Sequence, residues 1–221
     1  MKSKEFKEPG IPKELLKTED AMAVLKEAKE QETEIIKRHF KGTFLTKFDG
    51  SRIAFRQVVF ENCRFMGCKF DEAEFVDVRF ISCDFSNTSI VDTYFKNCSF
   101  NGFKAVGTDF YGSNMRHVSF ENCTVTDAGF DAVRMSYIRT KHVDFTRSGF
   151  SKCNIINADW KDTCFQEANF FKTSLMGMDL SDCNLEGIII SDGKEELRGA
   201  VVNMFQALAL AKRLGVVIKE M

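Results

Sequence analysis

The chain of 221 residues has no excess of charge of either sign, since 31 lysines and arginines stand against 32 aspartates and glutamates. A net charge of −1 excludes a general electrostatic attraction to nucleic acid or to an anionic membrane surface. The chain also lacks an apolar run long enough to span a membrane, and its N-terminal residues lack the apolar centre of a secretion signal. We therefore expect a cytoplasmic protein with reduced thiols, no membrane contact and no direct contact with nucleic acid.

Proline is nearly absent, with two residues, both before position 13, whereas phenylalanine is abundant, with 23 residues that mostly follow a period of five. From Phe55 to Ile190, the residue numbers divisible by five form one column of 28 positions, and Phe fills 16 of them. A second column lies two residues earlier, from Ile53 to Ile188, and contains mostly small or β-branched residues. Neither column contains a charge in a chain that is 29% charged, so we expect both columns to be buried.

A period of five fits neither a straight strand nor a helix. In a strand, a step of five residues puts successive phenylalanines on opposite faces. In a helix, five residues at about 100° each scatter the column around the axis. The chain must therefore turn between one pair of inward residues and the next, and four such sides close a square of 20 residues. Residues 53–192 make seven such coils, which stack at about 4.8 Å into a rod roughly 34 Å long.

Several five-residue units resemble those of the pentapeptide repeat family, in which a small residue, Asp or Asn, and Leu or Phe precede two polar residues. The closest matches are CDFSN (83–87), ANFFK (168–172), MDLSD (178–182) and CNLEG (183–187). The resemblance implies an all-β solenoid, a right-handed quadrilateral β-helix with the Phe or Leu column along its axis. We expect an N-terminal helical segment at 1–42, the β-helix at 43–192, and a C-terminal helix and tail at 193–221.

The repeat tolerates one exchange between its columns. At Phe103 and Ala105 the large and the small residue swap places, which keeps the volume that fills the coil nearly constant. No insertion interrupts the count between residues 53 and 190, so we expect a rod without projecting loops.

Both ends of an open stack of coils need caps, and both flanks have helical composition. Residues from about 18 to 38 contain no Gly or Pro and are rich in helix formers. From residue 194 to 214, apolar residues recur at intervals of three and four, and Gly215 stands where a helix is expected to end. The simplest interpretation of the second helix is a cap for the last coil.

The ending ALAKRLGVVI, which closes at Ile218, is similar to that of the fluoroquinolone-resistance members of the family, the Qnr and MfpA types. In those proteins the C-terminal helix and tail pair two rods end to end. The resemblance therefore implies a homodimer, as the alternative to a simple cap. Its interface would comprise Leu197, Val201, Met204, Phe205, Leu208, Leu214, Val216 and Ile218.

The same relatives are thought to imitate DNA and to engage DNA gyrase or topoisomerase IV. A duplex 34 Å long carries roughly 20 negative charges. Residues 53–190 carry 18 acidic and 14 basic side chains, and no side of the square is a continuous acidic stripe. The leading interpretation is therefore a non-enzymatic rod, homodimeric through its C-terminal helix, that serves as a protein-binding scaffold for an unidentified partner. Binding of a type II topoisomerase is the alternative.

Residues with chemical reactivity are scattered or inward-facing. Seven of the eight cysteines fall in the small column, where a thiol acts as a compact apolar filler, and Cys164 is the thiol that we expect to be most exposed. The histidines His39, His117 and His142 have no second ligand or nucleophile nearby, so we expect them at the solvated surface. The sequence predicts no catalytic residue, no metal site and no cofactor.

Outward-facing apolar residues are the remaining functional signal. Val91, Tyr111 and Phe171 occupy equivalent outward positions on one side of the square, the first two in neighbouring coils. Isolated apolar residues are common on protein surfaces, but equivalent positions in a repeat form a row. We therefore regard these three residues as a candidate partner surface.

Overall fold

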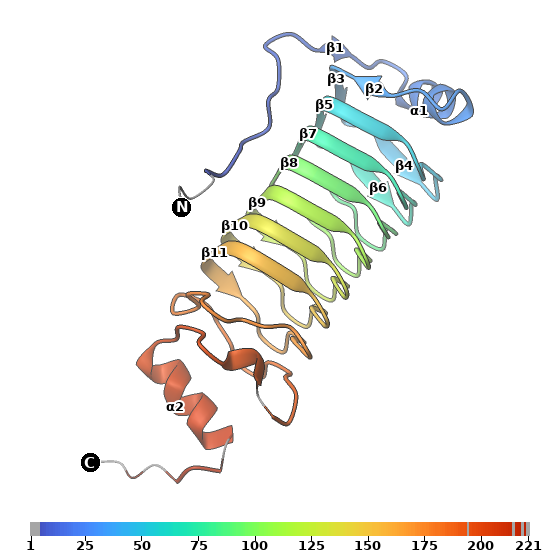
Figure 1. Ribbon diagram of the computed structural model, residues 1–221. Helices are drawn as coiled ribbons and strands as arrows, with labels where there is room; N and C mark the ends of the chain where they lie inside the picture. The colour runs from blue at the N-terminus through green and yellow to red at the C-terminus, as the bar shows by residue number, and fades with distance from the viewer. Residues whose placement is uncertain (1–4, 194, 214, 218, 220–221) are drawn as a thin grey trace.

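The computed structural model describes residues 5–193, 195–213, 215–217 and 219. Figure 1 shows a rod of stacked coils with one helix near each end. The elements, in chain order, are β1 (Leu16–Lys17), α1 (Ala21–Glu30), β2 (Ile35–Ile36), β3 (Arg38–Lys41), β4 (Phe44–Thr46), β5 (Ala54–Glu61), β6 (Arg64–Met66), β7 (Glu74–Ile81), β8 (Tyr94–Asn101), β9 (Asn114–Thr124), β10 (Arg134–Asp144), β11 (Asn154–Cys164), the 3₁₀ helix η1 (Glu195–Leu197) and α2 (Met204–Arg213). No helix among these residues is long and apolar enough to cross a membrane.

The strands pair in parallel, and from β2 onward each pairs with a strand of an adjacent coil. The main sheet has the order β1-β3-β5-β7-β8-β9-β10-β11, with β2 paired to β5, and β4 pairs with β6. The offset is 20 residues, as shown by the pairs of Phe55 with Phe75 and of Phe75 with Phe95. The predicted solenoid of about seven coils is therefore confirmed.

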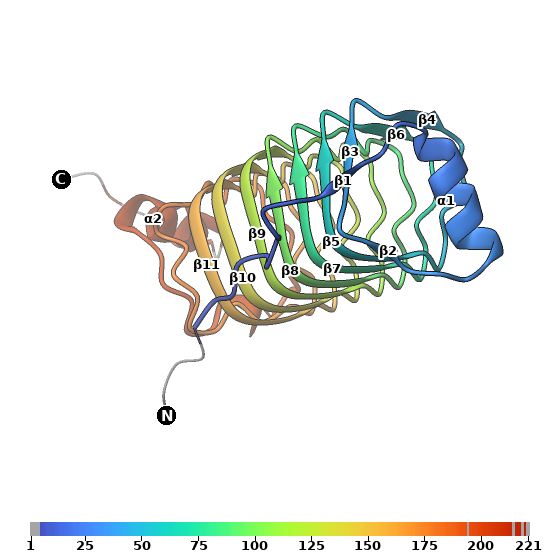
Figure 2. The ribbon, with the colours of Figure 1, turned by 90° about the horizontal axis from the view of Figure 1, so that it is seen from above.

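A backbone of positive φ marks nearly all corners of the square, with Asp182 as an exception. In one coil the corners are Gln57 (φ 56°), Asn62 (52°), Gly67 (60°) and Glu72 (57°), five residues apart. The left-handed conformation reverses which face of the chain points inward, which keeps successive phenylalanines on the same axis. Figure 2 shows the resulting coils stacked along a single axis.

The two uncharged columns form the core, as predicted. The rings of the large column stack from coil to coil; Phe55 and Phe75 have centroids 4.9 Å apart and planes 2° from parallel. The small column has an additional polar role, because its hydroxyls and thiols donate hydrogen bonds to carbonyls 23 residues earlier. Oγ1 of Thr108, for example, lies 2.8 Å from the carbonyl oxygen of Phe85. Ser, Thr and Cys therefore satisfy backbone acceptors inside the rod.

The exchange at Phe103 and Ala105 has the predicted result, since both residues are buried. The Phe103 ring lies 4.7 Å from that of Phe100 and 5.2 Å from that of Phe85. Phe103 thus fills the space on the axis that Ala105 leaves empty.

The N-terminal helix is shorter than the predicted range of 18–38. Asp20 caps α1, because its carboxylate accepts a hydrogen bond from the N–H of Ala23 (2.9 Å). After α1 the chain enters a coil, in which Ile35 pairs with Phe55 and the rings of Phe40 and Phe60 stack at 5.0 Å. In this coil the N–H and C=O groups of residues 35–41 form hydrogen bonds with the neighbouring strand. At the end of a longer helix, some of these groups would have no partner. The division of the chain at residue 43 remains a prediction.

The C-terminal helix is also shorter than the predicted range of 194–214. Residues before α2 continue the solenoid, since Val201 pairs with Asp179, 22 residues earlier. This coil is two residues longer than the regular 20, and it contains η1. There the Glu196 carboxylate accepts hydrogen bonds from the N–H groups of Lys172 (2.8 Å) and Ser191 (3.2 Å). These contacts bring the chain back into a coil before the helix begins.

Candidate interaction surfaces

The cysteines of the small column are packed inside the rod, since all seven are buried. Burial raises the pKa of the thiols of Cys98 and Cys153 to about 12, so they stay protonated near neutral pH. Cys164 is half-buried and more accessible than the other seven, as predicted. Among the described residues no group of three or more His, Cys, Asp or Glu side chains could hold a metal ion.

The surface position predicted for the histidines is wrong for His117, which is only 3% exposed. His142 is exposed, and His39 is half-buried with Nε2 lying 3.0 Å from a carboxylate oxygen of Glu61. His117 is covered by residues 5–15, which we call the N-terminal arm. The imidazole stacks on Tyr137 at 4.5 Å, and the Phe6 ring meets it edge-on at 5.9 Å.

The N-terminal arm runs back along the outside of the rod and is held by backbone hydrogen bonds (Figures 1 and 2). The N–H of Lys7 donates to Nδ1 of His117 (3.3 Å), and the N–H of Gly10 donates to Oδ1 of Asp77 (2.9 Å). Nε2 of Gln57 donates to the carbonyl oxygen of Gly10 (3.1 Å). Pro9 and Pro12, both within the arm, favour an extended chain, and they were the sequence signal for an arm instead of a helix.

The arm changes the electrostatics of the residue that it covers. Burial lowers the pKa of His117, and the positive charges of Arg116, Lys7 and Lys96 lower it further. The neutral imidazole can accept the hydrogen bond from Lys7 at Nδ1, whereas the protonated ring cannot.

The predicted partner surface contains two neighbouring residues and one distant residue. Val91 and Tyr111 lie in adjacent coils, because Ser89 pairs with Asp109, whereas Phe171 lies three coils beyond Tyr111. Tyr111 is 52% exposed and Phe171 is 37% exposed. The structure thus brings Val91 and Tyr111 together and leaves Phe171 apart, beside Lys172.

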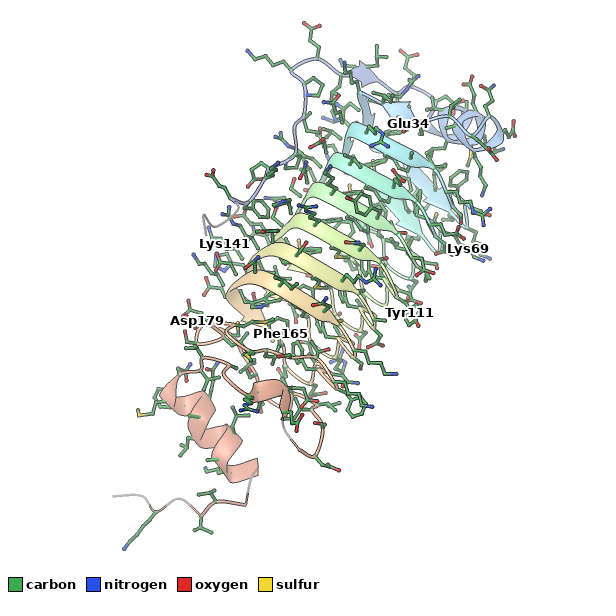
Figure 3. The ribbon with its side chains drawn as sticks, viewed as in Figure 1. Glu34, Lys69, Tyr111, Lys141, Phe165 and Asp179 are labelled. Carbon is green, nitrogen blue, oxygen red and sulfur yellow. The ribbon has the colours of Figure 1, made fainter. Side chains whose placement is uncertain are left out.

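Carboxylates surround the Val91 and Tyr111 pair, and we call this group the Tyr111 patch. Backbone N–H groups orient two of them, since Asp71 accepts from Val91 (3.0 Å) and Asp109 accepts from Tyr111 (2.9 Å). In the part of the chain that the structure describes, no cation lies within 4 Å of the patch carboxylates. The full set is Asp71, Val91, Asp92, Asp109, Tyr111 and Asp131. Figure 3 shows Tyr111 on the same side of the rod as Lys69.

The C-terminal end exposes several of the residues predicted for a dimer interface. Met204 is 77% exposed and Phe205 is 76% exposed, both on α2, and Val201, Leu208 and Val216 are also exposed. Leu197 is half-buried against the core of the rod. The predicted residues Leu214 and Ile218 lie outside the described residues.

Polar side chains hold α2 against the last coil. Nε2 of Gln206 donates to the carbonyl oxygens of Leu180 (2.8 Å) and Cys183 (2.6 Å), and Nδ2 of Asn203 donates to that of Ser181 (2.7 Å). A hollow of about 370 Å³ remains between α2 and this coil, with Phe205 at its edge. The helix is therefore fixed in direction while its apolar side chains face solvent.

Two models of pentapeptide repeats match parts of the chain. A model described as a pentapeptide repeat region matches residues 73–141, and one described as pentapeptide repeats (8 copies) matches residues 51–87 and 141–187. Comparison with curated proteins finds no match.

Three solved structures illustrate the structural similarity. A trypsin-treated variant of QnrB1, a plasmid-mediated fluoroquinolone resistance protein, is 20% identical, with 82% of this chain and 90% of that chain covered and a TM-score of 0.48. A pentapeptide repeat protein of the Arabidopsis thaliana thylakoid lumen is 21% identical, with 43% and 67% covered and a TM-score of 0.41. HetL of Nostoc sp. strain PCC 7120, involved in regulation of heterocyst differentiation, is 16% identical, with 76% and 89% covered and a TM-score of 0.33. These values support no conclusion on function.

Proposed function

The chain belongs to the pentapeptide repeat family, and from this premise we propose that it is a non-enzymatic, cytoplasmic scaffold that binds a protein partner and pairs with a second copy of itself. The observation that supports pairing most directly is the exposure of large apolar side chains on α2. Met204 and Phe205 are each more than three quarters exposed. Exposing large apolar side chains to water is unfavourable unless another molecule covers them.

A two-fold dimer would place the same surface of each chain in contact. Gln206 and Asn203 fix α2 against the last coil, so two such helices can meet without first being ordered. The hollow beside Phe205 could receive an apolar side chain of the second copy. Leu208 and Val216 would extend the contact.

Sedimentation velocity at micromolar concentration tests the dimer. We expect the wild-type chain to sediment as a dimer and Met204→Asp to sediment as a monomer, because the variant would bury an unpaired charge at the interface. Met66→Asp is the matched control, since Met66 is also exposed but lies on β6, near the other end of the rod. A wild-type monomer, or equal behaviour of the two variants, would remove the proposal.

The partner surface that we propose is the Tyr111 patch. Its carboxylates have no cation within 4 Å among the described residues, so a basic partner could neutralise them, and the exposed ring of Tyr111 could contact an arginine. A crosslinking amino acid introduced at Tyr111, used in the native host, tests this assignment. We expect specific crosslinked proteins that disappear in an Asp92→Lys, Asp109→Lys double variant. Products that persist in this variant would contradict it.

A type II topoisomerase is the second candidate partner. The patch presents negative charge, which a DNA-binding enzyme would attract. Over three coil spacings, however, it offers four carboxylates where duplex DNA offers about eight charges. A supercoiling assay with purified gyrase, with and without a quinolone, decides this case. No change in supercoiling or quinolone sensitivity at micromolar protein would exclude it.

A further inference from the structure

A second hollow lies on a different side of the rod, beneath the N-terminal arm. It has a volume of about 560 Å³, within the range of small-molecule sites, and is open to solvent. The arm contributes Glu8 to its lining, and residues of β7 to β11 contribute the rest. Figure 3 shows Lys141, one of these residues, on the side of the rod where the arm runs.

The floor of this hollow is a row of equivalent positions in five successive coils, the last of which carries Asp159, paired with Arg139. Strand pairing aligns Arg79 with Ser99, Ser99 with Ser119, and Ser119 with Arg139. Two serines therefore lie between two arginines, whose Cα atoms are separated by three coil spacings, or about 14 Å. Because the serines are short, the long arginine side chains can lean over them from both ends.

Some of the positive side chains around the hollow lie close to a carboxylate and others do not. Glu121 lies 3.6 Å from the ammonium of Lys141, and Asp159 lies 3.8 Å from that of Lys161. Arg79 and Arg139, in contrast, have no carboxylate within 4 Å in the described part of the chain. They are the positive charges that remain available to a ligand.

The arm positions one of these arginines without neutralising it. The guanidinium of Arg139 lies 4.3 Å from the centroid of the Phe6 ring. Such a contact restricts the side chain but leaves its N–H donors free. Glu8 lines the hollow but makes no ion pair with a described residue, so its carboxylate repels an incoming anion.

We propose that this hollow binds the phosphate group of a small molecule, held by Arg79 and Arg139 with the hydroxyls of Ser99 and Ser119 as further donors. Two planar guanidinium groups and two hydroxyls match the several oxygens of a phosphate better than those of a single carboxylate. This site is independent of the C-terminal dimer and of the Tyr111 patch, because it uses none of their residues.

Isothermal titration of the full chain with inorganic pyrophosphate at low ionic strength tests the proposal. We expect one saturable site per chain, about ten-fold weaker binding in Arg79→Gln and in Arg139→Gln, and no measurable binding in the double variant. Arg134→Gln is the matched control, because Arg134 is an exposed arginine of β10 on the neighbouring side of the rod, and it should bind as the wild type does. Glu8→Gln should bind more tightly, and high salt should weaken binding.

Arg139→Gln could release the arm, because Arg139 contacts Phe6. Arg79 makes no ion pair or cation–π contact with the described residues of the arm, so Arg79→Gln is the decisive variant. Absence of saturable binding by the wild type, or an equal loss in Arg79→Gln and Arg134→Gln, would overturn the proposal. A parallel titration with ATP identifies the source of the phosphate. Equal affinities would assign recognition to the phosphate chain, and tighter binding of ATP would show that the hollow also takes the nucleoside.

Discussion

The two ends of the rod carry helices of similar length, but the helices relate to the core in opposite ways. In α1, Leu25 and Ala28 are buried against the first coil. In α2, no described side chain is buried, and the largest apolar ones face solvent. The open edge of a solenoid exposes apolar surface unless something covers it.

The N-terminal end of the rod is therefore covered by its helix, whereas apolar side chains of α2 remain exposed at the C-terminal end. The N-terminal arm strengthens this contrast, because it ties residues 5–15 to the side of the rod as well. A cap buries its apolar residues on folding, and an interface buries them on association. Variants at the two ends should therefore affect different measurements.

The largest effect is expected for Leu25→Ala. Removing this buried side chain should lower the free energy of unfolding by about 2–5 kcal/mol, because a cavity forms between α1 and the first coil. Leu208→Ala, at an exposed position of α2, should cost less than about 0.5 kcal/mol in the monomer. Urea unfolding followed by circular dichroism, at a concentration where both variants are monomeric, checks the comparison. Equal losses of stability would contradict the distinction between the two ends.

An intermediate effect is expected for Glu196→Ala, which removes the acceptor for the N–H groups of Lys172 and Ser191. The loss should be about 1–3 kcal/mol and confined to the last coil and α2. Hydrogen exchange of the two amides checks it, with Glu195→Ala, at an exposed position of η1, as the control. Unchanged protection of the two amides would show that Glu196 does not hold this coil.

The pH dependence of the same contact follows from the pKa of Glu196. Burial acts to raise the pKa, but the hydrogen bonds from the backbone, Lys172 and Ser191 outweigh it, so the folded-state pKa lies below 4.5. The carboxylate therefore stabilises the fold fully above pH 4.5, and this contribution declines as the pH falls further. Protection of the two amides should weaken in that range in the wild type, and Glu196→Gln should remove this pH dependence. An unchanged pH profile in the variant would exclude Glu196 as its source.

The smallest effect is expected at the N-terminal arm. The pKa of His117 is lowered from 6.5 by burial and by Arg116, Lys7 and Lys96, so the docked arm favours the neutral ring. Docking should be complete above pH 6.5 and should weaken as the pH falls, because protonation removes the acceptor at Nδ1. The NMR signals of the Lys7 and Gly10 amides report this change.

Two variants control the pH experiment at the arm. His117→Gln keeps a hydrogen-bond acceptor but does not titrate, so it should abolish the pH dependence. His142→Gln, at an exposed position, should leave it unchanged. An arm that stays docked well below the pKa of His117 would contradict the assignment.

The fold was largely predictable because the same burial of inward-facing side chains repeats in every coil. Two uncharged columns at a period of five can both be buried only if the chain turns at regular corners, and this argument also identified the exchange at Phe103 and Ala105. The candidate surfaces were predicted only in part. Val91 and Tyr111 lie in adjacent coils, as the register requires. The period does not indicate that Asp71, Asp92 and Asp109 have no cation within 4 Å among the described residues.

The sequence by itself determined the solenoid, its core residues and the packing role of the cysteines, because each coil repeats the same five-residue pattern of inward-facing residues. The tertiary structure decided how the aperiodic segments attach. Residues 35–41 and 195–201 became parts of coils instead of helices, and His117 became buried. Arg79 and Arg139 came to lie on either side of two serines beneath the arm. These outcomes depend on surfaces that exist only after the coils have stacked, and they join residues up to 110 positions apart in the chain.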